Sequence, residues 1–486
     1  MADTGGQPYR EAVFGADGDP LGPCDGLVEP GVTDLLLFAH GWHNSPATAR
    51  ALDTAFFAPF GKLVAQTPQA RLACATVAWP SMRFTDESIP DVEPPAPGAQ
   101  PTGPGLDRAT RDGLAALHPG RHAAVRRLAV LLDEQPASWA AFEEFGSLAR
   151  QLAAVPAGGL ESGFAEDLPQ DEQGPPAVLY ESVPTLCRRL SEALDAGPAP
   201  DAWGPPGGPT PGAWGPGAAI PGAWNPGAGI PGAGGPGAGG PGAAIPGARG
   251  PAAGTPTGGY PVMVPAVVPW PWRGAKELLR QTTYYALKRR AGTVGELGLG
   301  PLLGRLARTA PDVRVHLVGH GHGARLVAFA LRGLPHGAHN VKSLTLLQGA
   351  LSHYSFACGL PHAPRGGGAL AALQDRVDGP VVASYSRHDS ALGVFYPLAF
   401  GLAGDPAAAG DDPRWRAMGA EGIRAVPGAV RMSLGEALRD GLPGSGCVSV
   451  DAAQVVRRGG PPAGAHSDIC HEELARLVLA AGRVGR

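Results

Sequence analysis

The sequence predicts an α/β protein with a mostly parallel central sheet, flanking helices, a helical cap insertion and a disordered Pro/Gly/Ala repeat. Three observations predict this. Short, nearly continuous apolar runs alternate with longer helical patterns, which is typical of parallel strands buried on both faces. A long excursion of amphipathic segments interrupts that alternation. Finally, the 74 glycines and 53 prolines among 486 residues are roughly twice the usual share, and they are densest in one tract.

Six apolar runs are predicted as core strands, because each is short and bounded by turn residues. They are 34–40, 70–79, 313–319, 343–349, 380–386 and 447–456. A helical pattern at 45–64 separates the first two. The run at 313–319 leads straight into another helical pattern at 323–334, so this part predicts a strand, a tight turn and a helix.

The excursion between residues 80 and 310 is too long for one crossover connection. Its helical patterns lie at 121–135, 138–155, 180–196 and 274–310. We therefore expect four parts: a first portion of the core at 1–79, a helical cap or insertion at 80–200, a repeat linker at 201–260 and the remaining core at 261–486. The apolar stretch 261–272 is expected to dock the chain back onto the folded part.

The repeat places the dipeptide Pro-Gly at every fifth position from Pro211 to Gly250. Proline removes a backbone donor and glycine carries maximal backbone entropy, so this period fits neither helix nor strand, and each Pro-Gly favours a type II turn. The tract is predicted as a disordered linker. Expansion of a tolerated surface loop explains it. Its tryptophans, among them Trp214 and Trp224, leave open a role in weak interactions.

Composition excludes several function classes. The formal net charge is −4 and no polybasic face is evident, so no nucleic acid partner is expected. No apolar run reaches the roughly 18 residues of a membrane span, and the N-terminus lacks the features of a signal peptide. The six cysteines form no CxxC pair, which favours reduced thiols and a cytoplasmic location. No metal motif stands out, and no cofactor is implied.

The turn at 319–323 carries the most informative motif. In a nucleophile elbow, Gly-x-Ser-x-Gly presents a serine hydroxyl on a sharp strand-to-helix turn, and the small flanking residues let the turn close. Here Gly319 and Gly323 supply both flanking glycines, with His320 and His322 between them, but Gly321 occupies the central position.

With this elbow, the chain resembles the α/β-hydrolase superfamily of esterase-like and lipase-like serine hydrolases over about 34–80 and 274–486. Two further loops are similar to the family's acid and histidine loops: SYSRHDSALG, which implies Asp389 as the acid, and GAHSDIC, which implies His466 as the base. The chain order of elbow, acid and histidine is that of the family.

HGWHN at 40–44 resembles the family's His-Gly oxyanion motif, carried by His40 and Gly41. This implies that the backbone N–H groups of Trp42 and His322 would face a developing oxyanion.

Each residue also has a structural reading. His40 and Gly41 would serve equally to close a tight turn. Asp389 would serve as a helix N-cap, and His466 would be a surface loop histidine, with His471 a nearby rival for its role. His320 is expected to be a packed structural residue.

The vacant nucleophile position decides the functional expectation. Glycine cannot be acylated, and loss of the nucleophile in a serine hydrolase costs about a millionfold in turnover. Ser384, Ser386 and Ser467 flank the acid and base loops, but nothing in the sequence brings one to the elbow.

The leading hypothesis is a binding or regulatory module with a small-molecule ligand. The alternative is an esterase-like or lipase-like hydrolase acting on an ester-like substrate, through an unconventional nucleophile or through water activated by His466 and Asp389. Interaction through the repeat is a third class.

Overall fold

The computed structural model describes residues 9–23, 26–41, 46–65, 69–87, 89–92, 104–153, 167, 181–196, 270–400 and 413–485. By internal contacts the chain divides into two units, Met1–Pro200 with Trp270–Arg486, and Asp201–Pro269. The predicted repeat at 201–260 lies outside the described residues. The predicted cap at 80–200 and the predicted core, except for residues 261–269, fall in the first unit, which is the one described below.

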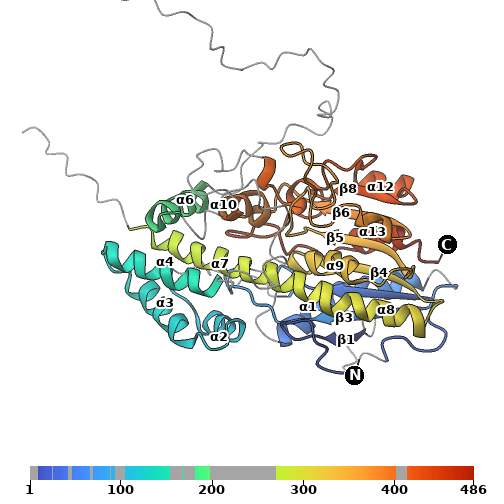
Figure 1. The fold of residues 1–486 in the computed structure, drawn as a ribbon, viewed down its shortest axis with the longest axis horizontal. Helices are drawn as coiled ribbons and strands as arrows, with labels where there is room; N and C mark the ends of the chain where they lie inside the picture. Colours follow the sequence, from blue (N-terminus) through green and yellow to red (C-terminus); the bar gives the residue numbers. More distant parts are fainter. Residues whose placement is uncertain are drawn as a thin grey trace, which may run out of the picture. The chain divides into compact units, whose positions relative to one another are not determined.

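A single eight-stranded sheet runs through this unit, and every strand pairing in it is parallel. The strand order is β1-β3-β2-β4-β5-β6-β8-β7 (Figure 1). The bounds are β1 Tyr9–Val13, β2 Asp34–Ala39, β3 Leu72–Ala78, β4 Arg314–His320, β5 Val341–Leu347, β6 Pro380–Tyr385, β7 Val430–Ser433 and β8 Gly446–Asp451. The predicted α/β class and parallel sheet are confirmed, and the six predicted strands all form.

The sheet extends beyond the six predicted strands at both edges. β1 (YREAV) and β7 (VRMS) carry charged residues and are partly exposed. Neither has the continuous apolar run that marks a strand buried on both faces. An edge strand is paired on one side only, so its sequence tolerates charge.

Helices cover both faces of the sheet. On one face, α1 (Pro46–Val64), α12 (Leu434–Asp440) and α13 (Glu472–Gly482) contribute to a core that contains Leu36 and Phe38 of β2. On the other, α8 (Gly300–Thr309) and α9 (His322–Gly333) pack with Leu35 and Leu37. Successive residues of a strand point to opposite faces, so a fully buried strand such as β2 contributes side chains to the hydrophobic core on each face.

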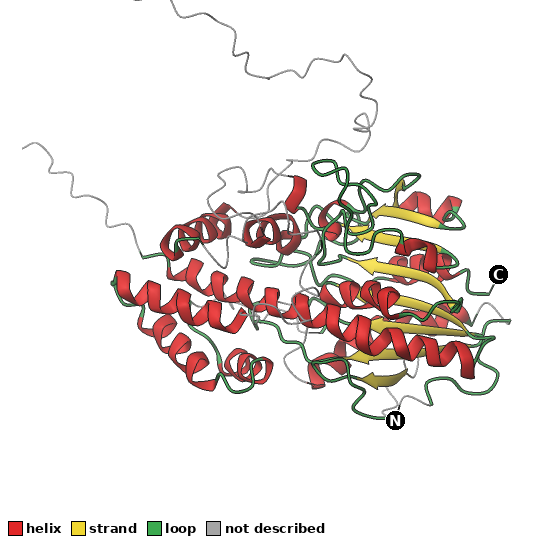
Figure 2. Ribbon diagram, in the orientation of Figure 1, coloured by secondary structure: helices red, strands yellow, loops and turns green. Residues whose placement is uncertain are grey.

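The cap is a group of helices beyond the carboxyl edge of the sheet, where the arrowheads of the strands point (Figures 1 and 2). It comprises α2 (Arg108–Leu117), α3 (His122–Glu134), α4 (Trp139–Ala153) and α6 (Val183–Ala196). Helices α3, α4 and α6 pack against α7 (Trp272–Thr293). The helical segment predicted at 274–310 is in fact α7, a π-helical turn η3 (Val294–Leu299) and α8.

Among the described residues between β5 and α12, five short helical turns lie in the segments that connect the strands. They are η4 (Leu373–Arg376), η5 (Ala391–Phe395), α10 (Tyr396–Phe400), η7 (Pro413–Trp415) and α11 (Met418–Glu421).

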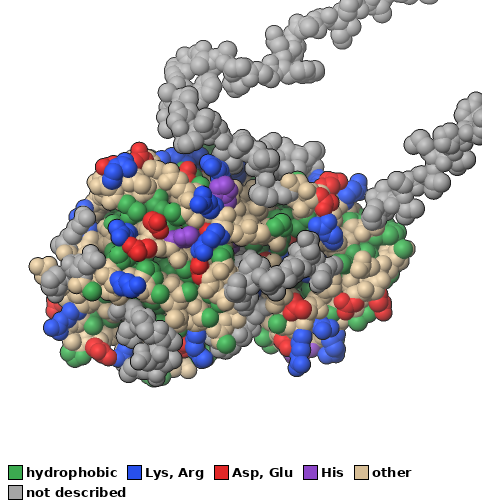
Figure 3. Space-filling view, turned by 180° about the vertical axis from the view of Figure 1, so that it is seen from behind, with side chains coloured by type: hydrophobic (Ala, Val, Ile, Leu, Met, Phe, Trp, Pro, Cys, Tyr) green, Lys and Arg blue, Asp and Glu red, His purple; other side chains and the backbone are tan. Residues whose placement is uncertain are grey.

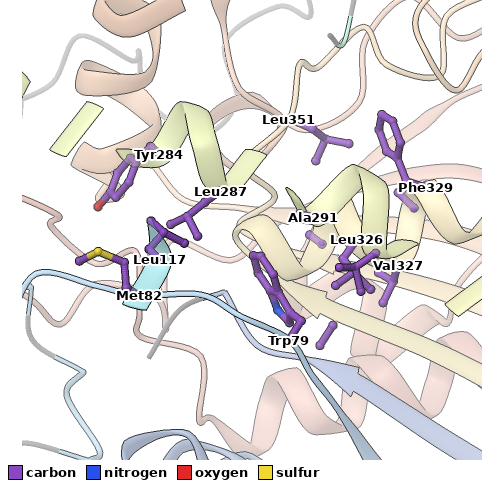
Figure 4. Packing of buried hydrophobic residues seen from close by; sticks show 14 of the residues in the cluster. Trp79, Met82, Leu117, Tyr284, Leu287, Ala291, Leu326, Val327, Phe329 and Leu351 are labelled. Atoms are coloured by element: carbon purple, nitrogen blue, oxygen red, sulfur yellow. The ribbon is translucent and has the colours of Figure 1, made fainter. Parts of the chain in front are cut away.

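Helix α7 joins cap and core through apolar packing (Figure 4). At one end of the cluster Tyr284 and Leu287 lie near Leu117 of the cap, and further along Ala291 approaches Leu326 of α9. These residues belong to one continuous buried cluster. The cap is thereby part of the main core and not a separate body.

A buried charge network adds to this joint. Arg280 of α7 donates from Nη2 to both carboxylate oxygens of Asp86 at 2.9 Å, and from Nε to Glu277 at 2.8 Å. Its Nη1 also bonds to Glu87. The arginine and lysine charges nearby lower the pKa of Asp86 to about 2 against the opposing effect of burial. Removing one member would leave a buried charge without compensation.

The predicted docking of 261–272 is met at its described end, residues 270–272. The ring of Trp272 lies 4.2 Å from that of Phe142 and edge-on to Phe145. Trp270 also stacks on Phe142, with ring centroids 5.5 Å apart. Aromatic pairs of this kind stabilise beyond their buried area.

On the face drawn in Figure 3, basic and acidic side chains are interspersed in small groups among the described residues. In the part of the chain that the structure describes, no helix is long and apolar enough to cross a membrane. The cysteines located there, Cys74, Cys187, Cys358, Cys447 and Cys470, are free.

Trp272→Ala tests the docking of the cap. Trp272 is 2 % exposed, so truncation should lower the free energy of unfolding by about 3–5 kcal/mol through lost burial and a cavity. Trp139→Ala is the matched control, because Trp139 is 60 % exposed and should cost less than about 1 kcal/mol. Urea denaturation measures both. Equal, small losses would mean that Trp272 does not anchor the cap.

Candidate functional site

The elbow lies between β4 and α9, at the carboxyl edge of the sheet. Gly321 has φ +55° and ψ −119°, a conformation that side-chain-bearing residues rarely adopt. A Cβ at Gly319 would lie 2.3 Å from the carbonyl oxygen of Gly323, and a Cβ at Gly323 would lie 2.0 Å from that of Ala39. The two flanking glycines are therefore required by close backbone approach.

Backbone hydrogen bonds fix the turn. The N–H of Gly321 donates to the carbonyl of Leu347 at 3.1 Å. Its own carbonyl accepts from Ala324 at 3.2 Å and from Ala350 at 3.0 Å. The central residue of the elbow is thus held by both the end of β5 and the first turn of α9.

Asp389 and His466 meet beside this turn, although 77 positions separate them. Nδ1 of His466 donates to Oδ2 of Asp389 at 2.7 Å, and both side chains are buried. Oδ1 of Asp389 accepts from the backbone N–H of Leu392 at 3.0 Å. The carboxylate of Asp389 therefore bonds both to the imidazole and to the backbone ahead of a helical turn, whose N-cap residue is Ser390.

The loops that carry these residues are joined by main-chain bonds. The N–H of Ala465 donates to the carbonyl of His388 at 2.8 Å, and that of Ala391 donates to Ala463 at 3.1 Å. Gly464 has φ +62°, and a Cβ there would lie 2.4 Å from the carbonyl oxygen of His388. This glycine permits the two loops to approach, which sets the position of the imidazole.

The imidazole of His466 stands directly against Gly321. A Cβ built on Gly321 would lie 2.9 Å from Nε2 of His466, closer than side chains approach in folded proteins. The ring thus occupies part of the space that a side chain at the elbow would need. The structure brings together the acid, the base and the vacant nucleophile position named from the sequence.

His320 supports the backbone of the histidine loop. Its Nε2–H donates to the carbonyl of His466 at 2.8 Å, and the ring is buried. A Cβ on Gly41 would lie 3.0 Å from both Nδ1 and the carbonyl oxygen of His320. Burial, together with His466, holds the pKa of His320 well below its usual value, so this ring is neutral. Its position agrees with the expected packed, structural role.

His322 is the first residue of α9, at the positive end of the helix dipole. Its ring lies edge-on to Tyr284 of α7, with centroids 5.8 Å apart. Burial, the neighbouring His466 and Lys288 lower the pKa of His322 to about 3. The sequence carries no motif for Tyr284 or Lys288, although their spacing of four places them on one face of the helix.

The other half of the expected oxyanion motif is described only in part. His40 is buried, and its carbonyl accepts from the indole N–H of Trp79 at 3.0 Å. Gly41 lies 3.7 Å, at its Cα, from a Cβ built on Gly321. Trp42 lies outside the described residues, so its predicted role stays a prediction.

Three of the four rival residues bond to partners away from the elbow. Nε2 of His471 bonds to Asp468 at 2.8 Å. Ser384 donates to the side chain of Gln348 at 3.0 Å, and Ser386 donates to the carbonyl of Val456 at 2.6 Å. Ser467 is buried next to His466 in the chain, and in the described structure its hydroxyl meets no hydrogen-bond partner.

Within the described ranges, no group of three or more His, Cys, Asp or Glu side chains is arranged to hold a metal ion. Comparisons with models of protein families, with curated proteins and with solved structures give no match to this chain.

His322→Asn tests the buried, neutral histidine. Below about pH 6.5 the unfolded chain binds a proton at this residue that the folded chain does not bind until about pH 3, so native stability falls as the pH is lowered. Between pH 7 and pH 5 one such histidine lowers the free energy of unfolding by about 2 kcal/mol. The free energy of unfolding of His322→Asn should therefore fall by about 2 kcal/mol less than that of the native protein over this range.

Urea denaturation at the two pH values measures the effect. The matched control is His336→Asn, because His336 is exposed and its replacement should leave the native pH dependence in place. A pH dependence of His322→Asn equal to that of the native protein would contradict the assignment.

Proposed function

We propose that this chain is an α/β-hydrolase-like protein that forms no acyl-enzyme and acts as a binding or regulatory module for a small-molecule ligand at the carboxyl edge of its sheet. One observation carries the proposal. Gly321 occupies the centre of the elbow, with the imidazole of His466 2.9 Å from the point where a side chain would begin.

The likeness to a hydrolase rests on the arrangement around the elbow. A parallel sheet, a glycine-framed strand-to-helix turn, and an Asp389–His466 hydrogen bond of 2.7 Å are the parts that the sequence resemblance implies. Their order along the chain is elbow, acid and histidine, as in that family. These features support the family assignment as a proposal.

The absence of a hydroxyl at residue 321 argues against covalent ester hydrolysis. An acyl-enzyme needs an oxygen or sulfur nucleophile within reach of the base. Ser384 and Ser386 donate their hydroxyl groups to other acceptors. A protein that keeps the shape of the site without its nucleophile is suited to bind a ligand and release it unchanged.

The Asp389–His466 pair supports a second candidate, hydrolysis by water. In this route Nε2 of His466 would take a proton from a water molecule while the oxygen of that water attacks the ester carbonyl. Asp389 would stabilise the imidazolium, and the N–H of His322 would face the oxyanion. The leaving alcohol would then take the proton back from His466, which balances the reaction without a covalent intermediate.

Interaction through the Pro/Gly/Ala repeat remains a third prediction, and it concerns residues outside the described ranges.

Gly321→Ser tests the vacant elbow with a fluorophosphonate probe. The new hydroxyl should attack phosphorus as His466 takes its proton, and fluoride should leave, so the variant becomes labelled while the native protein does not. The φ of +55° at this position makes serine strained by about 1–3 kcal/mol, and the ring of His466, 2.9 Å from the new Cβ, has to shift. Folding is therefore checked by circular dichroism.

Two controls accompany this test. Gly321→Ala imposes the same backbone strain without a hydroxyl and should stay unlabelled. The double variant Gly321→Ser with His466→Ala should also stay unlabelled, because the base is gone. Labelling of the native protein, or a folded Gly321→Ser variant that resists the probe, would overturn the proposal of an elbow that lacks only its nucleophile.

His466→Ala distinguishes binding from water-based hydrolysis. If the water route operates, the native protein should turn over a short-chain p-nitrophenyl ester, and the variant should lose about 10²–10⁴-fold in rate, the usual contribution of a general base. His336→Ala, at an exposed site, should leave the rate unchanged. A native rate that His466→Ala does not alter would exclude this route.

A further inference from the structure

A cavity of about 350 Å³ opens on the α1 side of the sheet, near the carboxyl ends of β1, β2 and β3. Its wall is largely apolar, and Val13, Phe14, Ala78, Trp79 and Pro80 form much of it. Such a volume lies within the range of small-molecule sites. It is distinct from the Asp389–His466 pair, which is not among its lining residues.

A carboxyl group lies at the base of this cavity. Asp53 of α1 lines it and is 2 % exposed. In the described structure, Oδ1 of Asp53 meets no hydrogen-bond partner. A buried acceptor left unmatched is costly to the fold, so its retention points to a donor that arrives with a ligand.

The other charged residues that line the cavity are Glu11 and Arg50, and both are exposed. Thr76 lines the same cavity, is itself buried, and donates its hydroxyl to the carbonyl of Phe38 at 3.3 Å. Glu11 lines the same cavity, and its carboxylate lies 3.6 Å from the guanidinium of Arg50. Arg50 and Glu11 are both well exposed, so they border the mouth while Asp53 closes the base.

We propose that this cavity binds a small organic cation, a primary ammonium on an aromatic or alkyl body, with the ammonium donating to Asp53 and the body packed against Trp79 and Phe14. The carboxylate of Glu11, and that of Asp53 once it ionises, disfavour an anion, and the apolar wall disfavours a fully hydrated ion. The N–H donors of an ammonium supply what Oδ1 lacks. This site does not depend on the proposed function of the elbow.

Binding should release a proton. Burial, reinforced by Glu11, raises the pKa of Asp53 to about 8, so the empty site holds a neutral acid at pH 7. An ammonium at hydrogen-bond distance favours the carboxylate, and the displaced proton passes to the buffer. The titratable or charged groups that face Asp53 are Tyr9 and Glu11 of β1, Arg50 of α1, His40 after β2 and Cys470 before α13.

The test is isothermal titration of the full-length protein with phenethylamine at pH 7 in two buffers of different ionisation enthalpy. We expect saturable binding with release of close to one proton. 2-Phenylethanol has the same body with a hydroxyl in place of the ammonium, and it should bind at least about tenfold more weakly.

Two variants separate recognition from folding. Asp53→Asn keeps the shape of the side chain and should weaken phenethylamine binding at least about tenfold and abolish proton release. Ala49→Leu fills the wall of the cavity on the adjacent turn of α1, leaves the carboxyl in place, and should also weaken binding. Asp375→Asn removes an exposed carboxylate elsewhere and should bind as the native protein does.

The proposal fails if native protein shows no saturable binding of phenethylamine, if 2-phenylethanol binds as tightly, or if a folded Asp53→Asn variant binds phenethylamine unchanged. None of these outcomes would touch the proposal for the elbow, because the fluorophosphonate test reads a different residue.

Discussion

The close approach of α9 to the end of β2 is the constraint on which the rest of the site depends. There is no room for a Cβ at Gly319 or Gly323, because backbone carbonyls lie within 2.3 Å of where each would stand. Parallel pairing of β2 with β4 places Ala39 beside Gly319, so the His40–Gly41 segment and the elbow meet at one edge of the sheet. Every other part of the site is positioned relative to this contact.

The loops that carry Asp389 and His466 are held to each other largely by main-chain hydrogen bonds. Main-chain bonds between residues 388–391 and 463–465 join them, and His320 secures the carbonyl of His466. Because Oδ2 of Asp389 also accepts from Nδ1 of His466 at 2.7 Å, the orientation of the imidazole depends on the backbone and on these side chains together. None of these bonds involves residue 321.

Sequence patterns predicted the interior of this fold better than its margins. Strands such as β2 and β5 are apolar throughout because both faces are covered, whereas β1 and β7 are short, charged edge strands whose pairing depends on neighbours far along the chain. The π-helical turn between α7 and α8 continues a helical pattern and leaves no local signal. Asp389 and His466 were named through resemblance to a family, since no local rule joins residues 77 positions apart. Asp53 was missed because an acidic residue in an amphipathic helix is usually solvated, and its burial depends on packing against segments far along the chain.

Helices α6 and α7 hold the two ends of one chain segment side by side. The N–H of Gly274 donates to the hydroxyl of Ser191 at 2.9 Å, and Arg273 pairs with Asp195 at 2.6 Å. The entropy of closing a loop grows only with the logarithm of its length, so each doubling costs about 0.6 kcal/mol. On the sequence-based prediction that the repeat is a disordered linker, the folded unit, with its exit and return points fastened together, is nearly indifferent to how many five-residue units lie between them. On that prediction, gain or loss of repeats carries almost no penalty in folding.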